Sequence, residues 1–229
     1  MNSKQKKPTP KRVFIVDDHP LMRLGLTQFL ASTDALAVCG EAANAREAME
    51  GIIEQRPDLI ILDISLPGRS GLEIIKELKQ RFPAGKILAH SMHDERIYGE
   101  RAIRAGARGY LMKKDSGTDL LDAIETVLGG RIYRGPNHQG EREPDLTGSA
   151  PLVSRLSDRE LEVFESIGRG RSNAEIARQL HLSVKTVDAH REHIKRKLGM
   201  KTGTELNLFA VRWVAADTTL AGNSENWDR

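Results

Sequence analysis

The stretch Leu59-Ile60-Ile61-Leu62-Asp63 decides the fold of this chain. Four apolar residues in a row, preceded by Pro57-Asp58, predict a short strand that is buried on both faces. Asp63 then lies where the strand leaves the core, at its carboxyl end. In an open α/β sheet, ligands bind and reactive residues lie at that edge. Taken alone, Asp63 could equally be a loop acid before a turn, so the remaining sequence must discriminate.

Short apolar runs alternate with helical patterns on both sides of this stretch. The predicted strands are residues 13–16, 35–39, 59–62, 86–89 and 109–112, and the predicted helices are 20–31, 45–55, 72–78, 96–105 and 118–128. In the first helix, the helical spacing is carried by Leu21, Leu24 and Leu30. Five such units imply an α/β domain over residues 12–130, with a five-stranded, doubly wound parallel sheet.

Polar side chains follow four of these strands at the point where each strand ends. Asp17 and Asp18 follow the first strand, Asp63 the third, Ser91 the fourth and Lys113 the fifth. Because parallel strands end at the same edge of a sheet, we expect these side chains to converge on one pocket. Each residue alone has an ordinary explanation as a turn, cap or surface residue. The four strand ends together favour a site.

Three carboxylates in one pocket require a cation. Two carboxylates about 5 Å apart repel each other by roughly 3 kcal/mol at an effective dielectric constant near 20. Oxygen ligands favour a hard ion that keeps several waters, and Mg²⁺ fits that description. With a lysine and a hydroxyl beside a free carboxylate, such a pocket has the groups needed for phosphoryl transfer to that carboxylate.

The motifs that carry these residues resemble the receiver domain of bacterial two-component response regulators. The resemblance covers residues 11–130 and includes the motifs Val16-Asp17-Asp18-His19-Pro20, Asp63 with Leu66-Pro67 and Gly71, Ser91-Met92-His93, and Gly109-Tyr110-Leu111-Met112-Lys113. It implies a flavodoxin-like fold in which Asp63 accepts a phosphoryl group from a sensor histidine kinase. The resemblance assigns Mg²⁺ binding to Asp17, Asp18, Asp63 and the Ser65 carbonyl, and phosphoryl binding or switching to Ser91, Tyr110 and Lys113. We do not expect His19 or His93 to bind metal or to act in acid–base chemistry.

Composition and charge narrow the class of protein. The 229 residues suffice for two ordinary domains, and the apolar runs are too short to span a membrane. Residues 11–130 contain 16 Lys/Arg against 18 Asp/Glu, whereas residues 151–212 contain 12 against 8, which hints at a polyanionic partner for the C-terminal part. The single cysteine, Cys39, cannot form an internal disulfide, and the polar N-terminus is no secretory signal, so we expect a cytoplasmic location.

Two tails and a linker complete the predicted organisation. Residues 1–11 are predicted to form a disordered basic tail, and residues 216–229 a second disordered tail. Residues 131–151 are rich in Gly, Pro, Asn and charged residues without apolar periodicity, and predict a flexible or loosely packed linker. Residues 152–215 then form a second domain.

The second domain is predicted to be all-α. Three capping boxes, Ser157 with Glu160, Ser172 with Glu175 and Thr202 with Glu205, precede helical patterns, and Ser183 is a fourth N-cap candidate. They place four helices at about 158–167, 173–180, 184–198 and 203–215. The middle two, joined by a tight turn, have the helix-turn-helix arrangement.

The helix predicted at 184–198 has two different faces. Its apolar face, which we expect to be buried, consists of Val184, Val187, Ile194 and Leu198. Its opposite face, which is free to meet a DNA groove, consists of Lys185, Asp188, Ala189, Glu192 and Arg196. An ordinary amphipathic helix with a solvated charged face is the alternative for this helix alone.

The pattern from Leu156-Ser157 through Ser172-Asn173 to Lys185-Thr186-Val187 and Lys197-Leu198-Gly199 closely resembles the LuxR-type DNA-binding domain. Joined to the receiver, the chain resembles a NarL/FixJ-type transcriptional response regulator. The resemblance implies that residues 184–198 enter the major groove of double-stranded DNA. The DNA-contacting residues are then Asn173, Ser183, Lys185, Thr186, Asp188, Ala189, His190, Arg191, Glu192 and Lys195. Asp188 and Glu192 stand where some relatives carry lysine, so no base preference transfers.

The last predicted helix carries more apolar residues than so small a core is expected to absorb. We expect it to serve as a dimer contact through Leu206, Phe209 and Trp213. Phosphorylation would then promote a symmetric homodimer on two DNA half-sites.

These features predict a DNA-binding transcriptional regulator that is switched by phosphorylation of Asp63 and is not an enzyme. The alternative from another class is a Mg²⁺-dependent phosphohydrolase. Such enzymes usually carry a second acid two residues after the nucleophile, where this chain has Ser65. A DNA-binding protein with a silent receiver fold is a third alternative, against which the complete set of acids with Lys113 argues.

Overall fold

The computed structural model describes residues 9–135 and 150–222. The chain divides into two compact units, Met1–Glu141 and Arg142–Arg229. The predicted disorder of residues 1–8 and 223–229, and the predicted linker at residues 136–149, lie outside the described residues. Lys11 was predicted to belong to the N-terminal tail, but it begins the first strand and its backbone N–H donates to the carbonyl of Ala35 at 2.8 Å.

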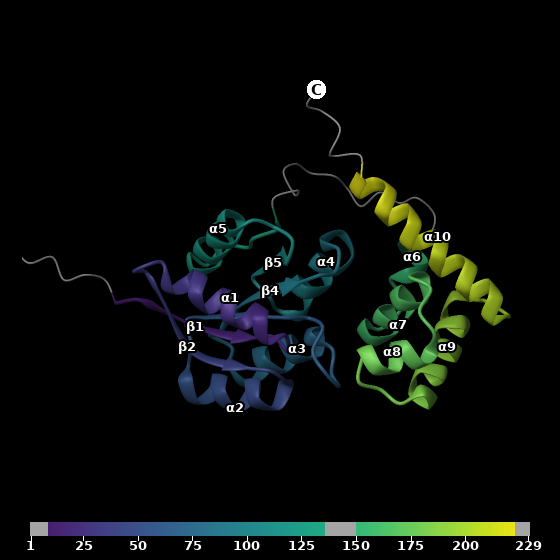
Figure 1. Ribbon diagram of the computed structural model, residues 1–229, viewed down its shortest axis with the longest axis horizontal. Helices are drawn as coiled ribbons and strands as arrows, with labels where there is room; N and C mark the ends of the chain where they lie inside the picture. The colour runs from purple at the N-terminus through teal and green to yellow at the C-terminus, as the bar shows by residue number, and fades with distance from the viewer. Residues whose placement is uncertain (1–8, 136–149, 223–229) are drawn as a thin grey trace, which may run out of the picture. The chain divides into compact units, whose positions relative to one another are not determined.

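A five-stranded parallel sheet forms the centre of the first unit, in the order β2-β1-β3-β4-β5 (Figure 1). The strands are β1 (Lys11–Val16), β2 (Leu36–Ala42), β3 (Leu59–Leu62), β4 (Lys86–Ser91) and β5 (Gly109–Met112). The helices are α1 (Pro20–Ala31), α2 (Ala45–Gln55), α3 (Gly71–Arg81), α4 (Glu95–Ala105) and α5 (Gly117–Leu128). Helices α1 and α5 cover one face of the sheet, and α2 and α3 cover the other (Figure 1). The predicted doubly wound fold is confirmed.

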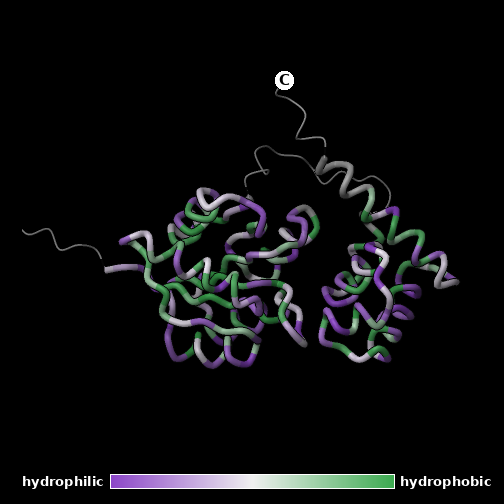
Figure 2. The backbone as a smooth tube through the Cα atoms, in the orientation of Figure 1, coloured by the Kyte–Doolittle hydropathy of each residue, from purple (hydrophilic) through white to green (hydrophobic). Residues whose placement is uncertain are grey.

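Strand β3 lies in the middle of the sheet, between β1 and β4. All four of its side chains are buried, because helices cover both faces of a parallel sheet. Figure 2 shows hydrophobic residues concentrated in the strands at the centre of this unit. The buried strand predicted from Leu59–Leu62 is therefore confirmed.

The side chains between the sheet and helices α1 and α5 form a continuous hydrophobic core. Strand residues Val13, Ile15 and Ile61 meet Leu30 of α1 and Ile124 of α5, and each of these side chains is at most 1% exposed. Burying one such side chain contributes about 1.5–3 kcal/mol. This core fixes where the strands end, and thereby fixes the positions of the polar residues that follow them.

Several segments of the first unit run beyond their predicted ends, among them β4, which ends at Ser91 rather than at residue 89. Strand β2 runs to Ala42 rather than ending at residue 39, because β1 continues beside it and Val16 pairs with Ala42. The start of the predicted linker is also more regular than expected. Tyr133 forms a parallel bridge with Gly109, and its N–H donates to the carbonyl of Arg108 at 2.9 Å. Residues 131–134 therefore form a segment along the edge strand, which we call the β5 strap.

The second unit is helical. Its helices are α6 (Ala150–Val153), α7 (Asp158–Gly168), α8 (Asn173–Gln179), α9 (Val184–Leu198) and α10 (Gly203–Gly222). The four predicted helices are confirmed, and the short α6 begins inside the predicted linker. Helix α10 continues past the predicted end, so the disorder predicted for residues 216–222 is wrong. Among the described residues, no helix combines the length and the apolar character needed to cross a bilayer.

Side-chain caps begin the helices of the second unit as the sequence predicts. Ser157 and Ser172 form complete capping boxes with Glu160 and Glu175. Thr202 forms only half of its predicted box. Its Oγ1 accepts from the N–H of Glu205 at 3.1 Å, but the Glu205 carboxylate accepts from the N–H of Lys201, one residue earlier than a box requires. A cap of this kind contributes about 1 kcal/mol.

Gly71, at the start of α3, allows a close approach of backbone to backbone. A Cβ at this position would lie 2.4 Å from the Cα of Ile64 and 2.7 Å from the carbonyl oxygen of Asp63. Neither atom can move without displacing the loop that follows β3. Gly71 is therefore required by the path of the chain beside Asp63.

We expect Gly71→Ala to lower the free energy of unfolding by about 1–3 kcal/mol, as over-packing does at other buried positions. The measurement is urea unfolding of the full-length protein, followed by circular dichroism. The matched control is Gly25→Ala in α1, where nothing lies within 4 Å of the added Cβ. That control should be neutral or slightly stabilising. Equal stability of the two variants would contradict the close approach.

Candidate functional site

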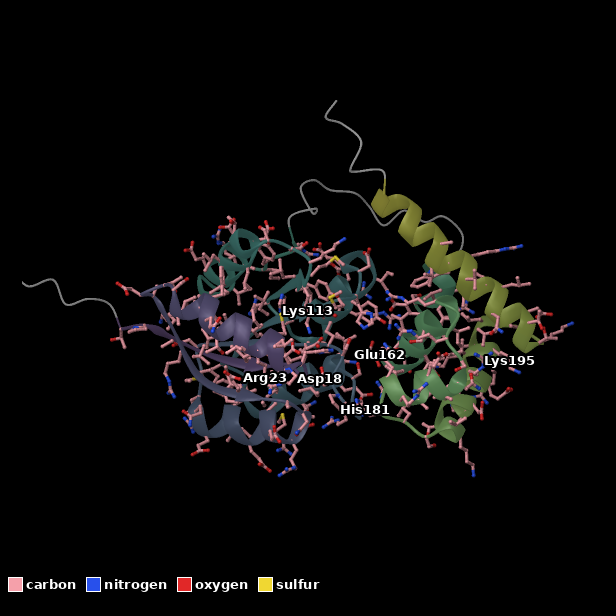
Figure 3. The ribbon with its side chains drawn as sticks, viewed as in Figure 1. Asp18, Arg23, Lys113, Glu162, His181 and Lys195 are labelled. Atoms are coloured by element: carbon pink, nitrogen blue, oxygen red, sulfur yellow. The ribbon has the colours of Figure 1, made fainter. Side chains whose placement is uncertain are left out.

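Lys113 joins two buried carboxylates at the carboxyl edge of the sheet. Its Nζ lies 2.7 Å from Oδ2 of Asp17 and 2.6 Å from Oδ2 of Asp63. The three side chains are at most 3% exposed. They come from the ends of β1, β3 and β5, so the convergence predicted from the parallel strands is confirmed for these residues. Lys113 is labelled in Figure 3, as is Asp18, which comes after the end of β1.

The charges in this pocket do not balance. Burial raises the pKa of Asp63. The charge of Lys113 acts to lower that pKa, and the neighbouring charge of Asp17 acts to raise it further. Burial alone would lower the pKa of Lys113. The charges of Asp63 and Asp17, together with the hydrogen bonds to them, outweigh it and hold that pKa above its usual value. Lys113 is therefore a charged ammonium group that pairs with two carboxylates at once. One positive charge does not neutralise two carboxylates, so the site favours the binding of a further cation.

The side chains beside Lys113 fit a hard divalent cation. One ligand atom from each of Asp17, Asp18, His19 and Asp63 lies within 4.8 Å of the others. Oδ1 of Asp18 is buried and forms no well-aligned hydrogen bond with a described residue, although Nδ1 of His19 lies 2.8 Å from it. The acids supply only oxygen, which hard cations prefer. The imidazole of His19, for which we expected no role, joins this group with Nδ1 2.8 Å from the Asp18 carboxylate.

Ser65 and Ser91 lie on the loops that border the pocket. The N–H of Ser65 donates to Oδ1 of Asp63 at 2.9 Å, which holds the loop after β3 against the acid. Ser91 is fully buried at the end of β4, and its Oγ accepts from the N–H of His93 at 3.2 Å. The imidazole Nε2 of His93 lies 2.9 Å from Oγ of Ser65. His93 thus connects the two loops, which sequence reasoning missed because the residues are 28 positions apart.

Tyr110 is buried beside the same loop. Its hydroxyl donates to the carbonyl of His93 at 2.7 Å, and its own N–H donates to the carbonyl of Tyr133 at 3.3 Å. The side chain of Tyr110 therefore contacts the loop after β4, while its backbone contacts the β5 strap. One residue joins the border of the pocket to the beginning of the linker.

The β5 strap also packs against α4. Arg134 forms an ion pair with Glu100, and Gly135 lies close against the carboxyl of Glu95. Burial raises the pKa of Glu95 to about 7, with further contributions from Asp115 and Asp94 and an opposing one from Arg134. Side chains of α4 therefore hold the strap in addition to its backbone bonds with β5.

Arg23 of α1 is a further charged residue at the pocket that the sequence did not predict. Its Nη1 donates to the carbonyl of Asp17 at 2.6 Å, and its Nε lies 3.4 Å from the carboxylate of Glu41 (Figure 3). Arg23 thereby fixes the backbone that presents Asp17 and Asp18. Nothing in the helical spacing of α1 separates this arginine from a solvated one.

In the second unit, α8 and α9 form the predicted helix-turn-helix. Ser183 caps α9 by accepting from the N–H of Thr186 at 3.0 Å. Val187, Ile194 and Leu198 are buried, as expected, but Val184 is 47% exposed because the first residue of the helix lies beyond the contacts of the core. The predicted outer face is exposed throughout, at Lys185, Asp188, Ala189, Glu192 and Arg196.

Several of the predicted DNA-contacting side chains have partners within this unit. Nδ2 of Asn173 donates to Oδ1 of Asp188 at 2.6 Å, and Nζ of Lys195 lies 2.8 Å from the carboxylate of Glu192. Arg191 donates to Asn207 of α10 at 2.8 Å. His190 is partly buried, and burial followed by the charge of Arg159 lowers its pKa.

The predicted dimer contact on α10 needs a correction. Leu206 is fully buried in the core of its own unit, so its assignment as a dimer contact is wrong. The rings of Phe209 and Trp213 lie 5.7 and 5.4 Å from the ring of Phe164 in α7, and both residues remain partly exposed. Among the residues of this helix whose side chains the structure describes, Leu208 and Val211 are the large apolar ones that are exposed.

Each half of the chain matches a known protein family. Residues 13–125 match the family described as "Response regulator receiver domain", and residues 154–210 match "Bacterial regulatory proteins, luxR family". The chain belongs to the LuxR-type two-component response regulators, in which a receiver domain precedes a helix-turn-helix domain that binds DNA to regulate transcription.

Individual relatives extend over most of the chain. The oxygen regulatory protein NreC of Staphylococcus carnosus is 35% identical over 213 residues, covering 88% of this chain and 97% of that protein. A LuxR-family response regulator from Aurantimonas sp. SI85-9A1 is 36% identical over 54% of this chain and 89% of its own, with a TM-score of 0.53. The RcsB response regulator of Salmonella typhimurium shares the fold, with a TM-score of 0.64, 24% identity, and coverage of 90% and 98% of the two chains.

Proposed function

We propose that this regulator is switched by transfer of a phosphoryl group to Asp63 from a phosphohistidine of its sensor kinase. An oxygen of Asp63 attacks phosphorus, the P–N bond of the donor breaks, and the electron pair leaves with the donor imidazole, which takes up a proton. The observation that carries the proposal is the placement of Asp63 beside Asp17 with Lys113 bridging both, at 2.6 and 2.7 Å. These groups are held in place before any donor arrives, which favours transfer.

Mg²⁺ fits the acid group, and we propose Asp17, Asp18, Asp63 and the carbonyl of Ser65 as its protein ligands. When bound, Mg²⁺ supplies positive charge that neutralises the oxygens of the incoming phosphoryl group. The side chain of Lys113 exchanges one of its carboxylate partners for a phosphoryl oxygen. Ser91 donates its hydroxyl proton to another. Arg23 keeps the backbone of Asp17 in place through the bond to its carbonyl.

The added charge reaches the linker through a short series of hydrogen bonds. Phosphorylation replaces the single negative charge of the Asp63 carboxylate with a phosphoryl group that carries about two. When Ser91 turns toward them, it changes the contact that its Oγ now makes with the N–H of His93. The carbonyl of His93 accepts from Tyr110, and the N–H of Tyr110 donates to Tyr133 of the β5 strap. The strap is therefore the part of the linker that responds first.

The output of the switch is DNA binding by α9. We propose that Lys185, Thr186, Arg191 and Lys195 contact phosphates and that Asp188, Ala189 and Glu192 face bases. Lys185 and the three base-facing residues are exposed, whereas Thr186, Arg191 and Lys195 are only partly exposed. Asn173 and Ser183 lie at the N-termini of α8 and α9, where backbone N–H groups attract phosphate. His190 is also partly buried, and we propose that it contacts DNA only at the edge of the groove.

A homodimer would present two such helices to two half-sites. Solved structures of RcsB include a complex with promoter DNA in the presence of the phosphomimetic BeF3−, and two RcsB dimers bound to two parallel DNAs. By this likeness we propose that phosphorylation promotes dimerisation here through α10. The contact would use exposed Leu208 and Val211, with the outer edges of Phe209 and Trp213.

Turnover of external phosphate esters is not proposed for this pocket. Ser65 occupies the position where phosphohydrolases with an aspartyl nucleophile carry their general acid, and its hydroxyl oxygen lies 2.9 Å from Nε2 of His93. We propose a cytoplasmic location, in line with the single, unpaired Cys39.

We expect Asp63→Asn to abolish incorporation of phosphate from a small phosphoryl donor such as phosphoramidate, because the attacking carboxylate is gone. Intact-protein mass spectrometry measures the incorporation, and removal of Mg²⁺ with a chelator should abolish it in the wild type. The matched control is Asp58→Asn at the opposite end of β3, which should be labelled normally. Undiminished labelling of the Asp63 variant would disprove the assignment of the acceptor.

We expect Tyr133→Ala to accept phosphate like the wild type but to lose most of the gain in DNA affinity that phosphorylation causes. Tyr133 packs against the core cluster of the first unit, so its truncation releases the strap without touching the pocket. The measurement is the dissociation constant for operator DNA before and after phosphorylation. Ile132→Ala, at a neighbouring exposed residue, is the control and should keep the gain. An unchanged gain in the Tyr133 variant would exclude the route through the strap.

A further inference from the structure

A hydrogen bond joins the two helices of the helix-turn-helix on their exposed side. Nδ2 of Asn173, in the first turn of α8, donates to Oδ1 of Asp188, in the second turn of α9. At 2.6 Å, this is a short, charge-assisted bond. It fixes the orientation of a carboxylate that would otherwise rotate freely on the helix surface.

The bond leaves Asp188 with unused acceptor capacity. Among the residues that the structure describes, Asn173 provides the one hydrogen bond to the Asp188 side chain. A carboxylate offers about four lone-pair sites, so Oδ2 remains available to a donor on the exposed face. Asp188 is exposed there, beside Lys185 and Glu192. The geometry therefore presents one oriented carboxylate oxygen to whatever occupies the face of α9.

A carboxylate in a DNA groove discriminates sharply among bases. It repels the phosphates, and it can only accept hydrogen bonds, so it needs an amino group on the base edge. In the major groove, cytosine presents the N4 amino group, and adenine presents N6 beside the acceptor N7. The N7 of adenine would repel the second carboxylate oxygen, whereas cytosine has no acceptor at that place. Guanine and thymine offer only acceptors at the corresponding positions.

The second acid on this face is in a different situation. The carboxylate of Glu192 lies 2.8 Å from Nζ of Lys195 on the same helix. A lysine can satisfy and neutralise that carboxylate in any DNA sequence, so Glu192 has less need of a base amino group. Asp188 accepts its hydrogen bond from a neutral amide. The charge of Arg191 also acts on Asp188, but the guanidinium of Arg191 donates to Asn207, so Oδ2 of Asp188 keeps its demand for a donor.

We propose that Asn173 positions Asp188 to select cytosine at one base pair of each half-site. Asn173 acts as a positioning residue and Asp188 as the base-reading residue. The inference rests on the proposed function only in taking the exposed face of α9 as the DNA-facing one. It adds a specific base and a residue of the first helix that sets it. Asp188 repels DNA that lacks the cytosine amino group at this position. The Asn173–Asp188 pair therefore favours sequence specificity over general affinity for DNA.

The experiment measures base preference at every operator position with full-length protein treated with phosphoramidate and Mg²⁺. A randomised operator library is selected with the wild type, Asp188→Ala, Asn173→Ala and the double variant. We expect Asp188→Ala to lose the cytosine preference, a change of about tenfold in relative affinity at that position. Asn173→Ala should weaken the same preference and no other. The double variant should be no less selective than Asp188→Ala.

A matched control removes an amide that holds a different charged residue of α9. Asn207→Ala breaks the bond between Asn207 and Arg191 and should leave the cytosine preference intact. A second variant, Asn173→Asp, places a like charge beside Asp188 and should lose the preference even if Asn173→Ala is poorly folded. Tryptophan fluorescence of Trp213, which packs in this unit, reports folding of each variant.

The outcomes separate this inference from the proposed function. If Asn173→Ala lowers affinity equally for all sequences, the residue is a phosphate contact and the inference is wrong. If Asp188→Ala leaves every preference unchanged while Lys185→Ala weakens binding, α9 meets DNA but Asp188 does not read a base. If neither the Asp188 nor the Lys185 substitution changes binding, the proposal that the exposed face of α9 contacts DNA is itself wrong.

Discussion

Lys113 lies between two buried carboxylates, and the rest of the first unit depends on this arrangement. Removing charges from water is costly, and one ammonium group cannot compensate Asp17 and Asp63 together. A fold that maximised stability alone would not keep an unbalanced pair in its interior. We propose that the imbalance is useful because further positive charge and a phosphoryl group can enter at this edge. The sheet serves to hold these three side chains close together without a ligand.

The same arrangement explains how a local change can be transmitted. Several hydrogen bonds hold the loops around the pocket, among them those from His93 to Ser91, from Tyr110 to the carbonyl of His93, and between His93 and Ser65. Bonds of this kind contribute about 0.5–1.5 kcal/mol each, so under the proposed switch a new doubly charged group would compete with them. The β5 strap begins one hydrogen bond further on, at Tyr133. In the second unit, the hydrogen bond from Asn173 of α8 similarly sets the orientation of the Asp188 side chain on α9.

The sequence predicted best what strand geometry dictates. The apolar run at 59–62 required a buried strand, and parallel strands required Asp17, Asp63 and Lys113 to end at one edge. Predictions failed where burial depends on what packs against an element. Leu21 and Leu24 have helical spacing with Leu30, yet they are 83% and 53% exposed, and Arg23 between them turns to the carbonyl of Asp17. Leu206 was expected to contact a second copy, but α10 lies against α7 and buries it. The β5 strap was unpredictable because a single bridge at Tyr133 leaves no periodic pattern.

The central claim is that charge added at Asp63 controls DNA binding by the second unit. Its most direct test is the dissociation constant of the full-length protein for operator DNA, at one fixed salt concentration, with and without phosphorylation. A coupling of ordinary strength predicts tighter binding by about 5- to 150-fold in the phosphorylated protein. Equal affinity in the two states, at full phosphorylation of Asp63, would contradict the account and leave a DNA-binding protein whose receiver is silent.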